Sequence, residues 1–243
     1  MPWTLARFAL CAEYSVLLLG LDNAGKTTFH EQVKALYSPD QPAPKLQTVP
    51  TVGQNVSTIT LSDMYMKIWD VGGQLSLRKL WQSYYQSCHA IVFIIDSTDI
   101  GDGSLDGTTT GGGGGGATNG LDGGVTTAAA AAAVAAAADD DDAGPGRLEE
   151  CRLVLEDVLQ HSDTEGVPLL ILANKQDRED CVEVVRIKEG LVKKVFEGEK
   201  ASSIRDSRVL PVSALTGTGV REAVEWLRSR VKWNKESRPP VKR

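Results

Sequence analysis

Residues 20–28 read GLDNAGKTT, and this stretch decides the fold. It begins where the apolar run VLLL at 16–19 ends, and residues compatible with a helix follow it. Its spacing fits G-x-x-x-x-G-K-[S/T], the turn between a strand and a helix whose backbone N–H groups surround the phosphates of a nucleotide. The sequence therefore predicts a phosphate-binding loop, and this motif by itself leaves ATPases, kinases and GTPases open.

The side chains of this loop have separate expected roles. The charge of Lys26 reaches the outer phosphates, the Thr27 hydroxyl binds Mg²⁺, and the Thr28 hydroxyl reaches the innermost phosphate. The backbone around them supplies the remaining donors. The residues predicted to bind the phosphates are Asp22, Asn23, Ala24, Gly25, Lys26, Thr27 and Thr28.

The sequence NKQD at 174–177 favours guanine over adenine as the base. It follows an apolar run and therefore stands at the carboxyl end of a predicted strand, where ligands bind in open α/β sheets. The carboxylate of Asp177 can accept hydrogen bonds from the ring N–H and the exocyclic amine of guanine, a donor pair that adenine lacks. We expect Lys175 to cover the face of the base and Asn174 to tie this loop to the phosphate loop. The backbone N–H groups expected to meet the guanine carbonyl follow the next predicted strand and belong to Ser213, Ala214 and Leu215.

The sequence WDVGGQ at 69–74 predicts a sensor of the third phosphate. Asp70 is expected to hold Mg²⁺ through water, the Gly73 N–H to approach the terminal phosphate, and Gln74 to orient the attacking water as the catalytic residue. Upstream, the hydroxyl of Thr51 in PTVG completes the Mg²⁺ shell only when a third phosphate is present. The predicted metal-binding residues are therefore Thr27, Thr51 and Asp70.

Hydrolysis by this set of residues is expected to be slow. No arginine or second catalytic carboxylate is apparent beside the motifs, and Val49 stands before Pro50 where a built-in arginine would help. A partner that supplies an arginine would accelerate the reaction. Slow hydrolysis of this kind is typical of a molecular switch that hydrolysis resets, rather than of an enzyme that uses hydrolysis to drive work. Two alternatives stay open: a GTP-dependent scaffold with negligible hydrolysis, and a P-loop kinase or ATPase, for which the sequence offers no adenine site or basic lid.

Short apolar runs alternate with helical patterns along the chain, which predicts an α/β fold with helices on both faces of a mostly parallel sheet. The second and third of six strands are joined tightly through Ser62 and Asp63, so this pair is expected to be an antiparallel hairpin at one edge. The predicted strands cover 14–19, 56–61, 64–69, 90–96, 167–173 and 208–212, and the predicted helices cover 26–36, 148–161, 184–196 and 220–233.

The predicted domain covers 14–233 and is interrupted at 100–146, a stretch that contains GGGGGG, AAAAAAVAAAA and DDDD. Few of its side chains can be buried, so we expect a disordered insertion without chemistry. The chain has a net charge of −6, and without this insertion the remainder carries +1. Residues 1–13 form an apolar segment that either lies on a membrane surface or packs on the domain. Residues 234–243 form a basic tail, expected to be a solvated helix end rather than a lipid contact.

The four cysteines are far apart in the sequence and form no pair with metal-binding spacing, which suits a cytosolic protein. No apolar run approaches the length of about 18 residues that a spanning helix needs. We expect no nucleic-acid partner.

Together these motifs resemble the ADP-ribosylation factor branch of the Ras-like small GTPases. GLDNAGKTT, PTVG, WDVGGQ, NKQD and the region 81–85 carry the resemblance, which covers about residues 14–99 and 147–233. It implies a Ras-like P-loop GTPase fold, GTP or GDP with Mg²⁺ as cofactors, and a GTP-hydrolysing switch for vesicle traffic on the cytosolic face of the Golgi. It also implies an exchange factor, a GTPase-activating protein, effectors, and peripheral membrane contact through an integral membrane receptor.

In that family, GTP binding shifts the strand hairpin, here 56–69, and moves the N-terminal helix toward the membrane. Two residues depart from the family pattern. Gln54 stands where members often carry an apolar residue, so we do not expect the usual effectors of the parent branch. Pro2 stands in place of the bulky residue that invites acetylation in a related protein, so we expect a different anchor. It also replaces glycine, which predicts that the chain is not N-myristoylated.

Overall fold

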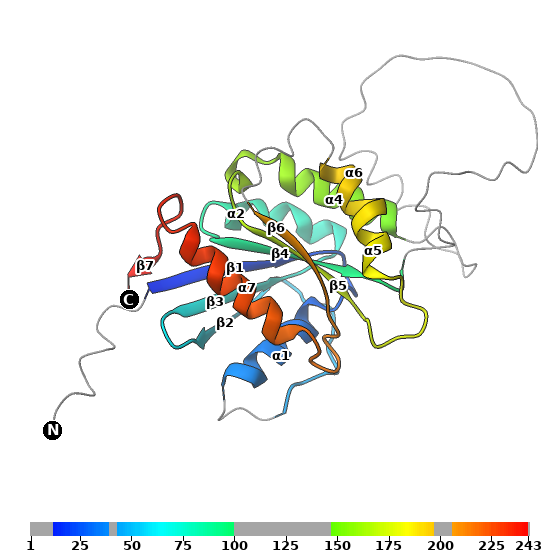
Figure 1. Ribbon diagram of the computed structural model, residues 1–243, viewed down its shortest axis with the longest axis horizontal. Helices are drawn as coiled ribbons and strands as arrows, with labels where there is room; N and C mark the ends of the chain where they lie inside the picture. The colour runs from blue at the N-terminus through cyan, green and yellow to red at the C-terminus, as the bar shows by residue number, and fades with distance from the viewer. Residues whose placement is uncertain (1–11, 39–42, 100–146, 197–205, 243) are drawn as a thin grey trace, which may run out of the picture.

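The computed structural model describes residues 12–38, 43–99, 147–196 and 206–242. They form a central sheet with helices on both faces (Figure 1). The predictions made for residues 1–11 and for the insertion at 100–146 lie outside the described residues.

The six expected strands are all present, and they follow the order β2-β3-β1-β4-β5-β6 in the sheet. Neighbours along this path are parallel except β2 and β3, which form the expected antiparallel hairpin at one edge. The fold class is therefore confirmed. The bounds are β1 Ala12–Leu19, β2 Gln54–Thr60, β3 Tyr65–Val71, β4 Ala90–Asp96, β5 Leu169–Asn174 and β6 Ser207–Pro211.

The central strands read as continuous apolar runs because both of their faces are covered. Successive side chains of β1 point to opposite faces, so Val16 and Leu18 enter one core cluster while Leu17 and Leu19 enter the other. Helices α1 (Lys26–Tyr37) and α7 (Val220–Trp233) pack on the first cluster, and α4 (Leu148–Gln160) packs on the second (Figure 1). These packed layers fix the carboxyl ends of the parallel strands, where the site lies.

The helix expected at 184–196 is interrupted. It consists of α5 (Val184–Ile187), a turn of π-helix η3 (Lys188–Val192) and α6 (Lys193–Phe196). Gly190 lies inside the π-helical turn, where its low helix propensity weakens the regular pattern. Three short elements had no periodic signal and were not predicted: η1 (Leu75–Leu80), α2 (Gln82–Tyr85) and η2 (Ser162–Thr164).

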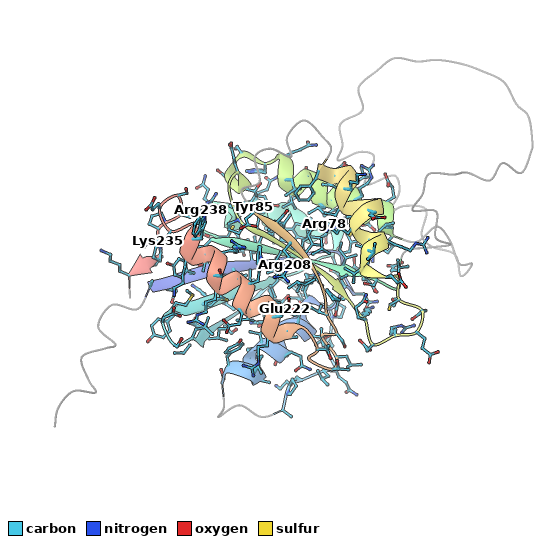
Figure 2. The ribbon with its side chains drawn as sticks, in the orientation of Figure 1. Arg78, Tyr85, Arg208, Glu222, Lys235 and Arg238 are labelled. Atoms are coloured by element: carbon cyan, nitrogen blue, oxygen red, sulfur yellow. The ribbon has the colours of Figure 1, made fainter. Side chains whose placement is uncertain are left out.

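A seventh strand, β7 (Val241–Lys242), pairs antiparallel with the first residues of β1. The preceding turn is held to the domain, because the Arg238 guanidinium donates to the carbonyl oxygens of Tyr85 at 2.9 Å and Cys88 at 3.0 Å (Figure 2). His89 Nδ1 accepts from a backbone N–H of β1, so its Nε2 carries the proton and donates to Pro239 O at 3.1 Å. The expectation of a solvated tail is therefore wrong for the described part of 234–243.

The sequence showed the positive charge of this tail but not the carbonyl groups that receive it. Two basic residues of α7 are also engaged, since Arg228 pairs with Asp63 at 2.9 Å and Arg230 with Asp206 at 3.0 Å. In the part of the chain described here, no helix is both long enough and apolar enough to span a bilayer.

Candidate nucleotide-binding site

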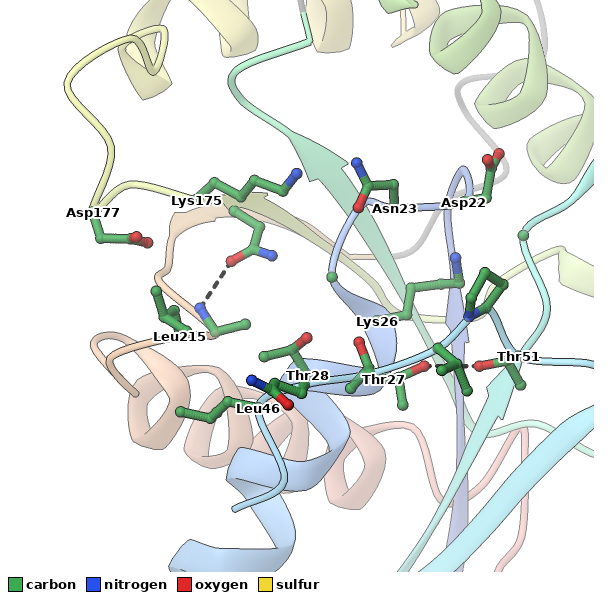
Figure 3. A pocket seen from close by; sticks show the side chains of 18 of the residues that line it. Asp22, Asn23, Lys26, Thr27, Thr28, Leu46, Thr51, Lys175, Asp177 and Leu215 are labelled. Carbon is green, nitrogen blue, oxygen red and sulfur yellow. Dashed lines mark hydrogen bonds between the residues drawn. The ribbon is translucent and has the colours of Figure 1, made fainter. Parts of the chain in front are cut away.

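A cavity of about 800 Å³ opens at the carboxyl ends of the strands (Figure 3). Residues of all the predicted motifs line it: the phosphate loop, Thr51, Gly73 with Gln74, and the two loops that follow β5 and β6. The predicted residues in the lining are Asp22, Asn23, Gly25, Lys26, Thr27, Thr28, Thr51, Gly73, Gln74, Asn174, Lys175, Asp177, Ala214 and Leu215.

Three predicted residues, Ala24, Asp70 and Ser213, are buried and lie outside this lining. Conversely, sequence analysis did not predict several residues that do line the cavity. They are Leu46, Gln47, Thr48 and Arg178. Val49 and Pro50 also line the cavity; in the sequence they were noted only as a position without an arginine and as the start of PTVG.

The phosphate loop depends on two glycines in conformations that side chains disfavour. Gly20 has φ of +136°, and a Cβ there would lie 2.2 Å from Ile94 O. Gly25 has φ of +92°, and a Cβ would lie 2.2 Å from Asn174 Nδ2. Gly25 precedes α1, whose N-terminus has no side-chain cap. The free N–H groups of this helix end and its positive dipole fit a bound phosphate.

Lys26 is buried at the base of the loop, with 5% of its surface exposed. Its Nζ donates to Gly20 O at 3.0 Å and to Leu21 O at 2.6 Å. Burial lowers the pKa of Lys26 to about 8, and the nearby carboxylates of Asp70 and Asp22 only partly oppose this effect. A polyphosphate would supply the opposite charge that the amine lacks.

The three predicted metal-binding side chains lie together at one end of the cavity. The Thr27 hydroxyl donates to Asp70 Oδ2 at 2.8 Å and shares a hydrogen bond of 2.8 Å with the Thr51 hydroxyl (Figure 3). Burial raises the pKa of Asp70, and its buried Oδ1 has no hydrogen-bond partner among the described residues. An unsatisfied carboxylate oxygen beside two hydroxyls fits Mg²⁺, a hard cation that prefers oxygen ligands.

These residues would hold the metal only together with the nucleotide. The described residues contain no group of three or more His, Cys, Asp or Glu side chains that could hold an ion alone. Mg²⁺ usually takes one or two protein groups, several waters and the phosphates of its substrate. When bound, it would neutralise phosphate charge next to the Thr27 and Thr51 hydroxyls.

The residues of the predicted guanine site form a hydrogen-bonded network at the opposite end. Asn174 Nδ2 donates to Ala24 O at 2.8 Å, which is the expected tie between this loop and the phosphate loop. The Ala214 N–H donates to Asn174 Oδ1 at 2.9 Å, and the Ser213 hydroxyl donates to Asp177 Oδ1 at 2.5 Å. The Asp177 carboxylate is thereby oriented before any base arrives.

This network corrects one expectation about the base. The Ser213 N–H donates to Thr218 O at 3.0 Å, and the Ala214 N–H is taken by Asn174. These two amides already have acceptors and therefore do not point freely at the guanine carbonyl, although Ala214 lines the cavity together with Leu215. Lys175 also has a second role, since its Nζ pairs with Asp96 Oδ2 at 2.5 Å.

The Gly72–Gly73 pair approaches the phosphate loop closely. A Cβ on Gly73 would lie 2.4 Å from Lys26 Nζ and 2.6 Å from Asp22 N. Behind the pair, Trp81 Nε1 donates to Gly72 O and Arg78 Nε donates to Gly73 O, both at 2.9 Å. Sequence reasoning missed Arg78 as part of the site, because nothing in its neighbourhood indicates that it folds back onto a glycine carbonyl.

Comparison with known proteins agrees with this arrangement. Residues 4–102 and 134–231 match the sequence model of the ADP-ribosylation factor family. The chain belongs to the ADP-ribosylation factor family. The chain is 45% identical to the yeast Saccharomyces cerevisiae "ADP-ribosylation factor-like protein 3" over 231 residues, which cover 94% of this chain and 91% of that protein. It is 34% identical to human "ADP-ribosylation factor-related protein 1" over 234 residues, which cover 95% of this chain and 90% of that protein.

A solved small GTPase shares the fold. The structure of the Arl6 BBS3 small GTPase from Trypanosoma brucei, with a bound nucleotide analogue GppNp, superposes with a TM-score of 0.61 at 24% identity. The match covers 90% of this chain and 98% of that one. The resemblance drawn from the motifs is confirmed. As a member of the ADP-ribosylation factor family, the chain is a small GTPase with guanine nucleotide and Mg²⁺ as its cofactors.

Proposed function

We propose that this protein is a slow, GTP-hydrolysing molecular switch that regulates vesicle traffic at the cytosolic face of the Golgi. Exchange factors, GTPase-activating proteins and effectors are general partners of small GTPases in this family. The proposal adds that an integral membrane receptor recruits the protein to its membrane.

One observation carries the switch. Thr51 and Gly73 belong to different segments, yet both reach the phosphate loop, at Thr27 and Lys26 respectively. Thr51 lies far along the cavity from the base-binding residue Asp177 (Figure 3), and Gly73 lies beside Lys26 of the phosphate loop. A third phosphate would contact both segments together, whereas a diphosphate would leave them without that contact.

The slow rate is supported by the lining of the cavity. Gln74 is exposed at the cavity edge and can orient a water molecule. Arg178 is the arginine that lines the cavity among the described residues, and it belongs to the base end, where it pairs with Asp180 at 2.7 Å. Charge stabilisation of the transition state therefore depends on a partner's arginine, which in related systems is worth about 10³–10⁵ in rate.

Single-turnover hydrolysis tests this function. We expect Gln74→Leu to bind GTP as the unchanged protein does and to lose the turnover that an activating protein stimulates. Gln82→Leu is the matched control, because Gln82 is also an exposed glutamine but lies in α2, outside the cavity lining. Turnover that no activating protein accelerates would instead favour a GTP-dependent scaffold.

The membrane part rests on the resemblance and needs its own experiment. Liposome flotation of the purified full chain, loaded with GDP or a non-hydrolysable GTP analogue at two salt concentrations, separates the possibilities. We expect no flotation in either state if a membrane-protein receptor recruits the chain. Flotation only with the GTP analogue would contradict the need for a receptor.

A further inference from the structure

Two carbonyl groups on the GTP-sensing loop are held from the side away from the phosphates. The Gly72 carbonyl accepts from the indole N–H of Trp81, which is buried with 2% of its surface exposed. The Gly73 carbonyl accepts from Arg78 Nε. In a trans peptide the N–H points opposite to the C=O of the same plane. Holding these two carbonyls therefore fixes where the N–H groups of Gly73 and Gln74 point.

Arg78 is in turn fixed by Glu150 from the first turn of α4. Arg78 Nη2 donates to Glu150 Oε1 at 2.6 Å, and the two side chains are 10% and 5% exposed. Burial alone would raise the pKa of Glu150, but hydrogen bonds from Arg147 and Arg78 hold it below its ordinary value. Glu150 is therefore ionised at neutral pH, and its pair with Arg78 is shielded from solvent screening.

The same carboxylate also reaches the phosphate loop, through Arg147. Arg147 Nε donates to Glu150 Oε2 at 2.8 Å, and its Nη2 donates to Asp22 Oδ1 at 2.8 Å. The Asp22–Arg147 pair is more open to solvent, with side chains 41% and 31% exposed. We expect it to contribute less than the buried pair, since exposed ion pairs are weak.

We infer that Glu150 is a positioning residue for GTP recognition: through Arg78, and together with Trp81, it holds the Gly72–Gly73 segment so that the Gly73 N–H faces the third phosphate. This inference rests on the proposed switch function. Glu150 touches no nucleotide, because it lies behind the loop and outside the cavity lining.

The inference predicts a selective effect. GDP has no third phosphate, so its affinity does not depend on where the Gly73 N–H points. GTP makes that contact, so loss of the Glu150 carboxylate weakens the binding of GTP more than the binding of GDP. A purely structural role for Glu150 would instead weaken both nucleotides together, because they share the base site and the phosphate loop.

The test compares Glu150→Gln with Glu149→Gln in the full chain. Glu149 is the matched control, because it is the adjacent residue of α4 but is 57% exposed and pairs with Arg152 on the outer surface. The measurement is the dissociation constant for GDP and for a non-hydrolysable GTP analogue, with Mg²⁺ present. We expect Glu150→Gln to weaken the analogue about tenfold, the size of one lost charged hydrogen bond, and to change GDP affinity less than about twofold. Glu149→Gln should leave both values unchanged.

A second variant keeps the inference testable if Glu150→Gln folds poorly. Trp81→Phe retains an aromatic ring in the core and removes only the Nε1 donor to Gly72 O. Like Glu150→Gln, this variant should lose more affinity for the GTP analogue than for GDP. Equal weakening of both nucleotides by Glu150→Gln, or an unchanged ratio in Trp81→Phe, would overturn the inference. Failure of the unchanged protein to bind either nucleotide would instead refute the proposed function.

Discussion

The two ends of the cavity are built differently. At the base end, Asn174, Ser213 and Ala214 are each less than 3% exposed. Asn174 hydrogen-bonds to Ala214 and to the phosphate loop, and Ser213 hydrogen-bonds to Asp177. At the sensing end, Val49 and Val52 beside Thr51 are 81% and 87% exposed. The base end is fixed by the core of the domain, whereas the segment that carries Thr51 lies on its surface. Gly73, the other sensing residue, is buried.

This difference indicates which part of the site can change conformation. A base site made from buried strand ends recognises guanine in either nucleotide state without rearranging. A sensing segment with little buried apolar surface has little to lose when it changes position, because local stability follows packing. The base is therefore recognised by residues fixed in the core, whereas recognition of the third phosphate also involves the exposed segment around Thr51.

The largest effect on stability and nucleotide affinity should come from removing the Asn174 side chain at the base end. Asn174→Ala removes the hydrogen bond donated to Ala24 O and the one accepted from the Ala214 N–H. The buried Ala24 carbonyl and Ala214 amide then have no partner from this side chain. We expect the free energy of unfolding, measured by chemical denaturation of the GDP-bound protein, to fall by about 2–4 kcal/mol. Affinities for GDP and the GTP analogue should fall by similar factors. Asn55→Ala, on the exposed edge strand β2, is the control and should change little.

Asp177→Asn should change the identity of the base that is read. The amide replaces one acceptor of the carboxylate by a donor, so one guanine N–H loses its partner and meets another donor. We expect GDP affinity to fall by at least about 100-fold and xanthosine diphosphate to bind better than GDP in a competition assay. Glu179→Gln, a nearby exposed carboxylate, serves as the control. Unchanged GDP affinity in Asp177→Asn would contradict the assignment of the base site.

The charge of Lys26 should make nucleotide affinity depend on pH. Its pKa is about 8 without nucleotide, below the ordinary 10.5, so the Lys26 amine is mostly neutral above pH 8. A bound phosphate favours the charged form, so the amine is protonated again on binding. Nucleotide binding should therefore take up a proton, and affinity should fall by up to about tenfold per pH unit above pH 8. Calorimetry in buffers of different ionisation enthalpy measures this uptake. Binding without proton uptake at pH 9 would show that Lys26 is already charged.

The same shift has a defined sign for folding. A buried lysine with a lowered pKa destabilises the empty protein below about pH 8, and this penalty decreases as the pH rises from 8 to 10.5. Bound nucleotide should remove the penalty. The empty and GDP-bound proteins should therefore differ less in stability at high pH.

The smallest effect should come from the sensing segment. Val52→Ser should change the free energy of unfolding by less than about 0.5 kcal/mol, because an exposed side chain loses almost no packing. Ile59→Ser in β2, where the side chain is 1% exposed, should instead cost several kcal/mol, on the order of other large core truncations. A large decrease in the free energy of unfolding of Val52→Ser would show that this segment is packed as firmly as the base end.

The sequence predicted the parts of the site that follow continuous apolar strands. The phosphate loop after β1, WDVGGQ along β3 and NKQD after β5 each lie where a buried run ends, and parallel strands bring such ends to one edge. Helix α7 and strand β4 have the expected bounds, because their patterns begin and end clearly.

What could not be predicted depends on contacts between distant residues. Arg78 and Glu150 are 72 positions apart. In sequence, Arg78 is a charged residue outside any predicted element, and Glu150 is one of several charged residues in a predicted helix. Glu150 is buried although its type is usually exposed, and only the approach of α4 to the sensing loop explains this. The docked tail depends likewise on backbone carbonyls, which no sequence pattern displays.

The short strand β7 has a practical consequence for protein engineering. Its pairing sets Lys242 opposite Ala12 and Val241 opposite Glu13, so the described chain starts and stops at one place on the sheet. Opposed antiparallel residues are about 5 Å apart, a distance that a linker of a few residues bridges. A fluorescent protein fused after β7 would therefore stand beside the start of β1. The same closeness makes a circularly permuted chain, with its old ends joined and new ends opened elsewhere, geometrically feasible.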